Sequence, residues 1–253
     1  MQPSFKETTV TVEELNAGYD GVTALRGVDF AATTGERIAL LGPNGGGKST
    51  LIRTLSGELA PISGAFNATE RIGTVSQRDS ARSDWPATAL DVAICGTLDS
   101  LPWWRVPRRA QRTAALEALD AVGLKDMAGK RFGELSGGQR RRAQVAAALA
   151  GGAKVLLLDE PFAGLDNVSS ERLEALIADL ARAGTTLLVA THDLDQARSW
   201  EKVLCLNGEQ IAFGPPDDVL EKDTLRKTFG ADLLEIAGGG LMAPPHHHHD
   251  HEH

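Results

Sequence analysis

The residues best suited to chemistry lie in three short stretches of this chain. GPNGGGKST at Gly42–Thr50 has the spacing G-x-x-x-x-G-K-[ST] of a loop that binds polyphosphate. Its glycines let successive backbone N–H groups point at phosphate oxygens, Lys48 can reach the β- and γ-phosphates, and the Ser49 hydroxyl can ligate Mg²⁺. VLLLDEP at Val155–Pro161 is an apolar run that ends in two carboxylates, as a buried parallel strand ends at a nucleotide site.

The two carboxylates, Asp159 and Glu160, are adjacent in the sequence. Adjacent residues that leave a strand point to opposite sides, so these two side chains are expected to do different work. A pair of solvated acids at a strand end is the alternative.

The remaining stretch, LSGGQ at Leu135–Gln139, is predicted to begin a helix with Ser136 as its N-cap. Such a helix start can bind an anion through its free N–H groups and its dipole, although alone it indicates an ordinary helix start equally well.

Strand and helix patterns alternate around these motifs. Strands are predicted at Thr8–Leu15, Val28–Thr33, Arg37–Leu41, Arg71–Val75, Val155–Leu158, Thr185–Ala190, Val203–Leu206 and Gln210–Phe213, and helices at Ser49–Ser56, Arg108–Val122, Ser169–Ala183 and Leu194–Trp200. Between about residues 78 and 150 strand residues become rare and Ala, Leu and Arg dominate. We therefore expect an α/β core with a parallel sheet and an inserted helical subdomain, with the ligand at the carboxyl ends of the strands.

Composition excludes several other classes of protein. The 253 residues carry a net charge of −8, which gives no basic field for nucleic acid. Cys95 and Cys205 match no metal or redox spacing and are expected to be small buried residues in a reducing compartment. No apolar run is long enough to cross a membrane, and the N-terminal residues do not read as a signal peptide. The expected location is the cytoplasm.

Together the three motifs resemble those of the ATP-binding cassette (ABC) ATPases, and the resemblance extends from about Thr9 to Phe229. It implies a P-loop NTPase (RecA-like) α/β core, an N-terminal antiparallel β-subdomain and the inserted helical subdomain, all within residues 1–237. It also implies ATP and Mg²⁺. The implied nucleotide-binding residues are Tyr19, Gly42, Pro43, Asn44, Gly45, Gly46, Gly47, Lys48, Ser49, Thr50, Ser136, Gly137, Gly138, Gln139 and Asp166. Relatives more often carry a side chain at Gly46, where we expect glycine to cost only some loop stiffness.

The resemblance also implies individual roles at the hydrolytic centre. Asp159 and Ser49 would hold Mg²⁺, and Glu160 would orient or deprotonate the attacking water. Gln77 matches the residue that touches both Mg²⁺ and this water, and His192 matches the residue that touches the γ-phosphate.

Two further implied roles concern the adenine ring of ATP and the partner subunit. Tyr19, the only tyrosine, would stack on adenine, with a half-buried surface aromatic as the alternative. The Leu135–Gln139 stretch resembles the family's signature sequence, which contacts the γ-phosphate held by the other subunit. A head-to-tail homodimer with two ATP molecules at its interface follows, with Asp166 in a loop that crosses the interface.

The cargo is suggested by less specific similarities. SDWPATALDV at Ser83–Val92 and PFAGLD at Pro161–Asp166 are similar to the ATPase subunits of bacterial zinc and manganese importers. This similarity implies the ATPase subunit of a metal importer, with zinc as the first expectation and manganese as the second. The implied partners are a multi-span membrane permease and an extracytoplasmic metal-binding protein, with the chain peripheral on the inner face of the membrane. The alternatives are an iron–siderophore or haem importer, a regulatory or repair ABC ATPase without a permease, and a metal-binding module whose ATPase is vestigial.

The C-terminal residues 238–253 are expected to be a disordered Gly/Pro linker followed by a histidine-rich tail. HHHHDHEH at His246–His253 offers six imidazoles and two carboxylates, which are good ligands for Zn²⁺. The tail could therefore bind zinc loosely. A purification tag is the alternative origin of this tract.

Overall fold

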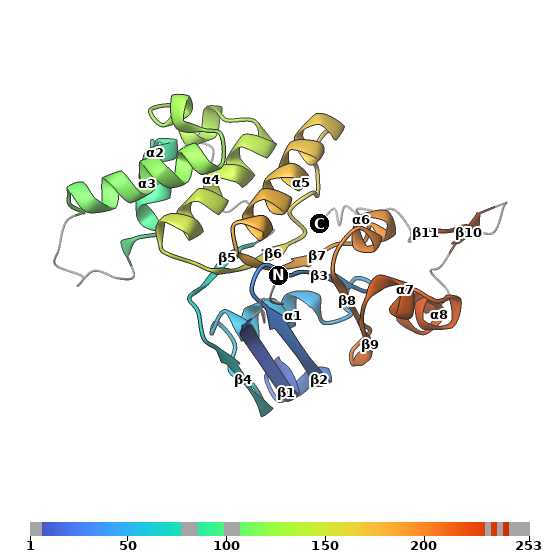
Figure 1. Ribbon diagram of the computed structural model, residues 1–253. Helices are drawn as coiled ribbons and strands as arrows, with labels where there is room; N and C mark the ends of the chain where they lie inside the picture. Colours follow the sequence, from blue (N-terminus) through green and yellow to red (C-terminus); the bar gives the residue numbers. More distant parts are fainter. Residues whose placement is uncertain (1–6, 77–85, 99–106, 231–233, 237–239, 243–253) are drawn as a thin grey trace, which may run out of the picture.

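The protein is represented by a computed structural model that describes residues 7–76, 86–98, 107–230, 234–236 and 240–242. Figure 1 shows a central sheet with helices above it, a second, smaller sheet below it and one helix between the two sheets. The expected α/β core, antiparallel β-subdomain and helical subdomain are all present.

The central sheet has the strand order β5-β6-β7-β3-β8-β9. Its strands are β3 (Arg37–Leu41), β5 (Ile72–Val75), β6 (Val155–Asp159), β7 (Thr186–Ala190), β8 (Lys202–Leu206) and β9 (Gln210–Gly214). Neighbouring strands pair in parallel except β8 and β9, which pair antiparallel. All six were predicted from the sequence to within one residue at each end.

Both faces of this sheet are covered, which explains why its strands are continuous apolar runs. In β6, Leu156 and Leu158 join a core cluster with the helices above the sheet. Val155 and Leu157 point the other way, into a cluster with α1 (Lys48–Leu55) and the smaller sheet. Each fully buried leucine contributes about 1.5–3 kcal/mol, so the strand that carries the carboxylates is firmly held.

The smaller sheet has the order β2-β1-β4 and is antiparallel. Its strands are β1 (Thr8–Tyr19), β2 (Val22–Thr33) and β4 (Ser63–Ala68). β1 is four residues longer than predicted because bulges, one at Glu14 with φ 45°, interrupt the period-two pattern that marks a strand. Asp20 and Gly21, both with positive φ, form the tight turn into β2. β4, which is largely exposed, was not predicted.

The helical subdomain lies between β5 and β6 in the sequence. It contains α2 (Ala89–Cys95), α3 (Arg109–Ala121), two 3₁₀ turns at Lys125–Met127 and Phe132–Glu134, and α4 (Gly137–Ala150). α2 was not predicted, although Thr88 and Asp91 form a capping box at its start. Buried Phe132, Leu119 and Ala146 join this subdomain to the same core cluster as the upper face of the sheet.

After β6 the chain forms α5 (Asn167–Arg182), α6 (Leu194–Arg198), α7 (Pro216–Val219) and α8 (Lys222–Phe229). Residues 234–236 and 240–242 then pair as the short strands β10 and β11. Disorder was expected from about residue 238, so β11 is a difference from that expectation. His246–His253 lie outside the described residues. Among the helices that the structure describes, none has the length and apolar character needed to cross a membrane.

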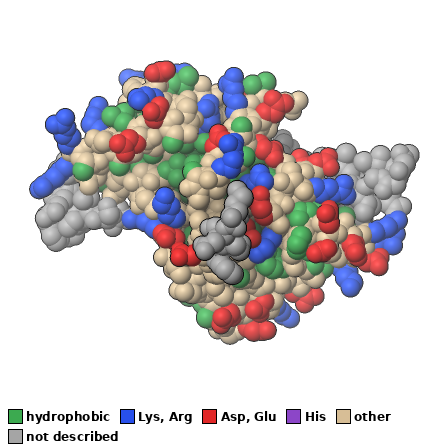
Figure 2. All heavy atoms as spheres, viewed as in Figure 1, with side chains coloured by type: hydrophobic (Ala, Val, Ile, Leu, Met, Phe, Trp, Pro, Cys, Tyr) green, Lys and Arg blue, Asp and Glu red, His purple; other side chains and the backbone are tan. Residues whose placement is uncertain are grey.

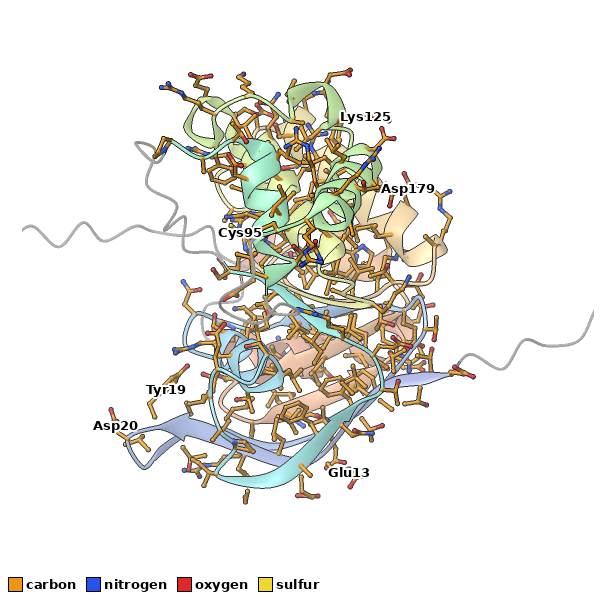
Figure 3. The ribbon with its side chains drawn as sticks, turned by 90° about the vertical axis from the view of Figure 1, so that its left-hand side faces the viewer. Glu13, Tyr19, Asp20, Cys95, Lys125 and Asp179 are labelled. Carbon is orange, nitrogen blue, oxygen red and sulfur yellow. The ribbon has the colours of Figure 1, made fainter. Side chains whose placement is uncertain are left out.

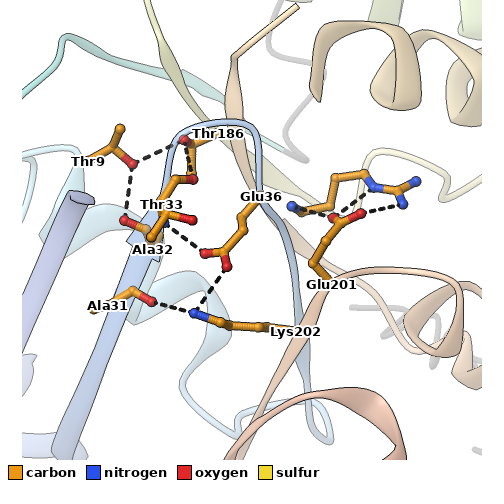
Figure 4. A network of polar contacts seen from close by, with 9 residues as sticks. Thr9, Ala31, Ala32, Thr33, Glu36, Thr186, Glu201 and Lys202 are labelled. Atoms are coloured by element: carbon orange, nitrogen blue, oxygen red, sulfur yellow. Dashed lines mark hydrogen bonds and ion pairs between the residues drawn. The ribbon is translucent and has the colours of Figure 1, made fainter. Parts of the chain in front are cut away.

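A polar network joins the two sheets (Figure 4). The carboxylate of Glu36 accepts a hydrogen bond from the backbone N–H of Thr33 at 2.7 Å and lies 3.2 Å from the Lys202 ammonium. Lys202 also donates to the carbonyl of Ala31 at 3.2 Å. Because Ala31 and Thr33 end β2 while Lys202 begins β8, these contacts fix the smaller sheet against the central one.

Charges of both signs are mixed over the helices on the face that Figure 2 shows, and acidic side chains gather along its lower edge, over the smaller sheet. Exposed Glu13, Glu14 and Asp20 belong to that sheet. This face offers no broad basic surface.

Candidate nucleotide-binding and hydrolysis site

The register of the central sheet brings three of the predicted segments to one edge. β7 lies between β3 and β6, and Ala190 at its end pairs with Leu40 on one side and with Asp159 on the other. The phosphate-binding loop follows β3, Glu160 follows β6, and His192 follows β7. The parallel strands therefore place the loop, the two carboxylates and the histidine at the same edge of the sheet.

The phosphate-binding loop has a shape that only glycine allows. Gly47 has φ 99°, and a Cβ there would lie 2.7 Å from a methyl carbon of Leu25. A Cβ at Gly42 would lie 2.1 Å from the carbonyl oxygen of Leu206. At Gly46, a Cβ would lie 3.0 Å from that same oxygen and from two atoms of Pro43. The absence of a side chain at Gly46 thus fits close packing in this loop, a reason that the sequence did not supply.

Lys48 begins α1 and is 6% exposed. Its ammonium donates to the carbonyls of Gly42 at 2.7 Å and Pro43 at 3.1 Å, and it lies 4.0 Å from the Glu160 carboxylate. Burial lowers the pKa of Lys48, and the nearby charges of Glu160 and Asp159 oppose this effect. The lysine is thus held inside the loop that would receive the phosphates.

Asp159 has the features expected of a magnesium ligand. Burial raises its pKa, and the nearby charge of Glu160 adds to this effect, while a hydrogen bond from Ser49 and the charges of Lys48 and Arg141 oppose it. Its Oδ1 atom is buried and has no hydrogen-bond partner. A buried, unpartnered carboxylate oxygen beside a hydroxyl suits a hard cation such as Mg²⁺, which prefers oxygen ligands.

Glu160 differs from its neighbour in both conformation and surroundings. Its φ of 45° is unusual for a residue other than glycine, and such backbone strain is common at functional sites. Asp159 is bonded to Ser49, whereas Glu160 lies beside Lys48 and opens into a cleft. The two carboxylates therefore have different surroundings.

This cleft has a volume of about 470 Å³. The residues that line it are Glu160, Phe162, Ala163, Gly164, Asn167, Ser170, Thr191, His192, Asp193 and Gln196. It brings together Glu160, His192 and the first part of the loop at residues 163–166, namely Ala163 and Gly164. Gln77 lies outside the described residues.

The signature stretch begins α4 as predicted. The Ser136 side chain accepts a hydrogen bond from the backbone of Gln139 at 3.3 Å, and the Gln139 side chain accepts one from the backbone of Ser136 at 3.0 Å. Ser136 and Gly137 are exposed. The side chain of Gln139 is therefore engaged in this capping box, while the exposed helix start can meet an anion outside the subunit.

Asp166 is the N-cap of α5 and accepts a hydrogen bond from the backbone of Ser169 at 2.6 Å. Hydrogen bonds from Ser169 lower the pKa of Asp166. This residue therefore has a local structural role that the sequence analysis did not assign to it.

Tyr19 ends β1 at the hairpin tip beside α1 (Figure 3). Its hydroxyl lies 3.5 Å from the Thr50 hydroxyl and accepts a hydrogen bond from Arg53 at 3.3 Å. The Arg53 guanidinium lies 5.3 Å from the ring centroid, within the range of a cation–π contact. The ring is 37% exposed, so part of its surface is open to a ligand.

The sequence analysis missed residues that act on the site through tertiary contacts. Arg141, 6% exposed, donates from α4 to the carbonyl of Ser76 at 2.7 Å, at the end of β5. Gln196 accepts a hydrogen bond from Thr191 at 3.0 Å and donates one to Glu174 at 3.3 Å, which links the segment of His192 to α5. No short motif marks these residues, because the contacts of Arg141 with Ser76 and of Gln196 with Glu174 join residues distant in sequence.

Known proteins match most of the chain. The model of the ABC transporter family matches residues 25–163. The chain is 35% identical over 88% of its length to a manganese transport system ATP-binding protein of Bacillus subtilis, of which 93% is covered. It is 34% identical over 88% of its length to a zinc transport system ATP-binding protein of Treponema pallidum, of which 88% is covered.

A solved structure agrees with these matches. A transporter described as a metal-chelate type ABC transporter, in an inward-facing conformation, includes a chain with a TM-score of 0.81 and 31% identity to this one. The match covers 88% of the present chain and 89% of the solved one. Given the family match and a site built on Lys48, Asp159 and Glu160, the chain belongs to the ABC transporter family and is one of its ATP-hydrolysing members.

Proposed function

We propose that this chain is the ATPase subunit of an importer for a divalent metal ion, zinc or manganese, and that it works as a homodimer on a separate membrane permease. The observation that supports the proposal is the proximity of Lys48, Asp159 and Glu160 on a chain whose relatives are named for manganese and zinc transport. An importer of iron–siderophore or haem is the alternative, supported by the metal-chelate type of the matched structure and by a relative named for chelated iron transport.

In the proposed reaction the phosphate-binding loop holds the triphosphate of ATP. Lys48 leaves the carbonyls of Gly42 and Pro43 and pairs with the β- and γ-phosphates. Ser49 and Asp159 would hold Mg²⁺, and a cation bound there would supply charge neutralisation for the transferred phosphoryl group. Glu160 orients and deprotonates the attacking water, and His192, across the same cleft, contacts the γ-phosphate.

The second half of each site is supplied by a partner copy. The exposed start of α4 offers free N–H groups and a helix dipole to a γ-phosphate bound by the other subunit. Two ATP molecules then lie between opposed subunits, with Asp166 in the loop that crosses the interface. Closure of the dimer on ATP and its opening after hydrolysis would move the helical subdomain, which contacts the permease on the inner face of the membrane.

Replacing Glu160 by Gln tests this mechanism. The amide keeps the size of the side chain but cannot accept the proton, and loss of a general base costs about 10²–10⁴-fold in rate. We expect turnover to be abolished and an ATP-bound dimer to accumulate in size-exclusion chromatography. A variant that keeps most of its ATPase activity, or that stays monomeric with saturating ATP and Mg²⁺, would contradict the mechanism.

The cargo is tested by uptake of radioactive zinc, manganese and iron into cells that lack this chain. Restoring the wild-type chain should restore uptake of zinc or manganese, whereas the Glu160→Gln variant should restore none. Recovery of chelated-iron uptake alone would favour the alternative importer.

We also propose that the tail at His246–His253 binds Zn²⁺ through its imidazoles. Among the residues that the structure describes, no group of three or more potential ligands could hold a metal ion, so the tail would be a separate site. Calorimetric titration with ZnCl₂ should show additional zinc bound by the full chain compared with a chain ending at residue 245. Equal zinc stoichiometry in the two would refute this proposal.

A further inference from the structure

The start of α4 and the start of α5 lie against each other with no room for a side chain between them. A Cβ at Gly138 would lie 2.7 Å from the Cβ of Ser169 and 2.8 Å from its hydroxyl oxygen. At Gly137, in contrast, a Cβ would lie 3.5 Å from a methyl carbon of Leu165, an ordinary contact distance. Of the two signature glycines, only Gly138 is therefore required by packing within its own subunit.

Ser169 cannot easily move away from Gly138, because it is held at the first turn of α5. Its backbone N–H donates to Asp166 at 2.6 Å, and its hydroxyl also bonds to the Asp166 side chain. On the opposite side, the Ser136–Gln139 capping box fixes the first turn of α4. Two capped helix starts thus meet through a glycine and a short side chain.

We propose that Ser169 is a positioning residue, which sets the place of the signature motif relative to the loop at residues 163–166 through its contact with Gly138. The contact joins the first turn of α4 to the first turn of α5, directly after this loop. The proposal rests on the dimer proposed above, in which the motif contacts the partner's ATP and the loop crosses to the partner. It adds a direct packing contact between the helices that carry the two parts of one subunit's interface, the signature motif and the loop at residues 163–166.

The consequence is that Gly138 must be glycine for two separable reasons. One is the approach of its backbone to the partner's phosphate, and the other is its contact with Ser169. A methyl group at position 138 could fail for either reason. Removing the side chain at position 169 relieves only the contact with Ser169. A substitution at position 169 therefore distinguishes the two reasons.

The experiment measures steady-state kcat and KM for ATP, together with thermal unfolding, for the full-length protein and five variants. Gly138→Ala introduces the clash, and the Gly138→Ala/Ser169→Gly double variant removes it. Gly138→Ala/Ser170→Gly is the matched control, since Ser170 is the neighbouring serine in the same turn; it is judged by its unfolding temperature because Ser170 lines the cleft beside Glu160. Ser169→Val introduces the clash from the other side and leaves the signature sequence intact, and Ser169→Gly is the reference.

We expect Gly138→Ala and Ser169→Val each to lower kcat about five-fold or more, the effect of overpacking by one or two methyl groups, with KM for ATP little changed. KM should be preserved because the phosphate-binding loop is untouched. The kcat of Gly138→Ala/Ser169→Gly should return to within about two-fold of that of Ser169→Gly, a difference of about 0.4 kcal/mol in activation free energy. The Ser170→Gly control should give no recovery.

Three results would overturn the proposal. They are a Gly138→Ala/Ser169→Gly variant as inactive as Gly138→Ala, equal recovery with Ser170→Gly, and a Ser169→Val variant with normal kcat. Failure of the dimer itself is detected separately, by the absence of an ATP-dependent dimer in the Glu160→Gln variant. In that case the packing contact is still judged by unfolding temperatures, which should fall in Gly138→Ala and recover with Ser169→Gly.

Discussion

Arg141 gives the sharpest test of how the helical subdomain acts on the hydrolytic centre. It lies in the signature helix α4, yet its guanidinium donates to the carbonyl of Ser76 at 2.7 Å, at the end of β5. The next residue is Gln77, the predicted contact of Mg²⁺ and water. The charge of Arg141 also lowers the pKa of Asp159, although burial keeps that pKa above its ordinary value. We expect Arg141→Met to affect both stability and turnover.

The stability effect follows from the burial of this contact. Hydrogen bonds to charged groups contribute about 1.5–3 kcal/mol, and the Ser76 carbonyl would lose its charged partner. In a chain of this size each kcal/mol changes the unfolding temperature by about 2–4 °C, so we expect a fall of about 3–12 °C. Arg141→Lys keeps the positive charge and a donor group, so its unfolding temperature should lie between those of Arg141→Met and the wild type.

The turnover effect has a matched control in the next residue. Arg142 also donates to a backbone carbonyl, that of Val122 at 3.0 Å, but this contact stays within the helical subdomain. Arg142→Met should lower the unfolding temperature without the same loss of kcat. Arg141→Met should lower kcat about five-fold, equivalent to about 1 kcal/mol.

A pH profile separates the electrostatic part of this effect. Without the Arg141 charge the pKa of Asp159 should rise further, and Mg²⁺ requires the ionised carboxylate. As the pH falls, Arg141→Met should therefore lose its activity at a higher pH than Arg142→Met does. Identical kcat, pH profile and unfolding temperature in Arg141→Met and the wild type would refute the reasoning.

Two other predictions concern the scaffold around the site. The expectation that both cysteines are buried is wrong for Cys95, which is exposed, and right for Cys205, which is buried. Burial raises the pKa of Cys205 to about 11, so a thiol reagent at pH 8 should modify one cysteine in the native protein and two in denaturant; rapid native modification of both would contradict the burial of Cys205. Lys202→Met should cost about 3–5 kcal/mol because it leaves the buried Glu36 carboxylate without its cation. Lys202→Met/Glu36→Gln should recover part of that loss in chemical denaturation, and equal stability of the two variants would count against the pairing.

Much of this protein is encoded locally in its sequence. The strands at Arg37–Leu41 and Val155–Asp159 were predicted because strands covered on both faces are uniformly apolar. The phosphate-binding loop and the Ser136 cap were recognisable because their function depends on fixed spacing along a few residues. These local features were sufficient to predict the family, the α/β core and the edge of the sheet at which the site lies.

Other features exist only in the folded chain. β4 was missed because an exposed strand of a small antiparallel sheet has little apolar pattern, and bulges hid the full length of β1. The partners of Arg141 and Gly138 were not predictable, since each contact joins residues that are distant in sequence. Local spacing thus determined which chemical groups are present, and tertiary packing decided which of them meet, because helices and strands are positioned by the surfaces they bury together.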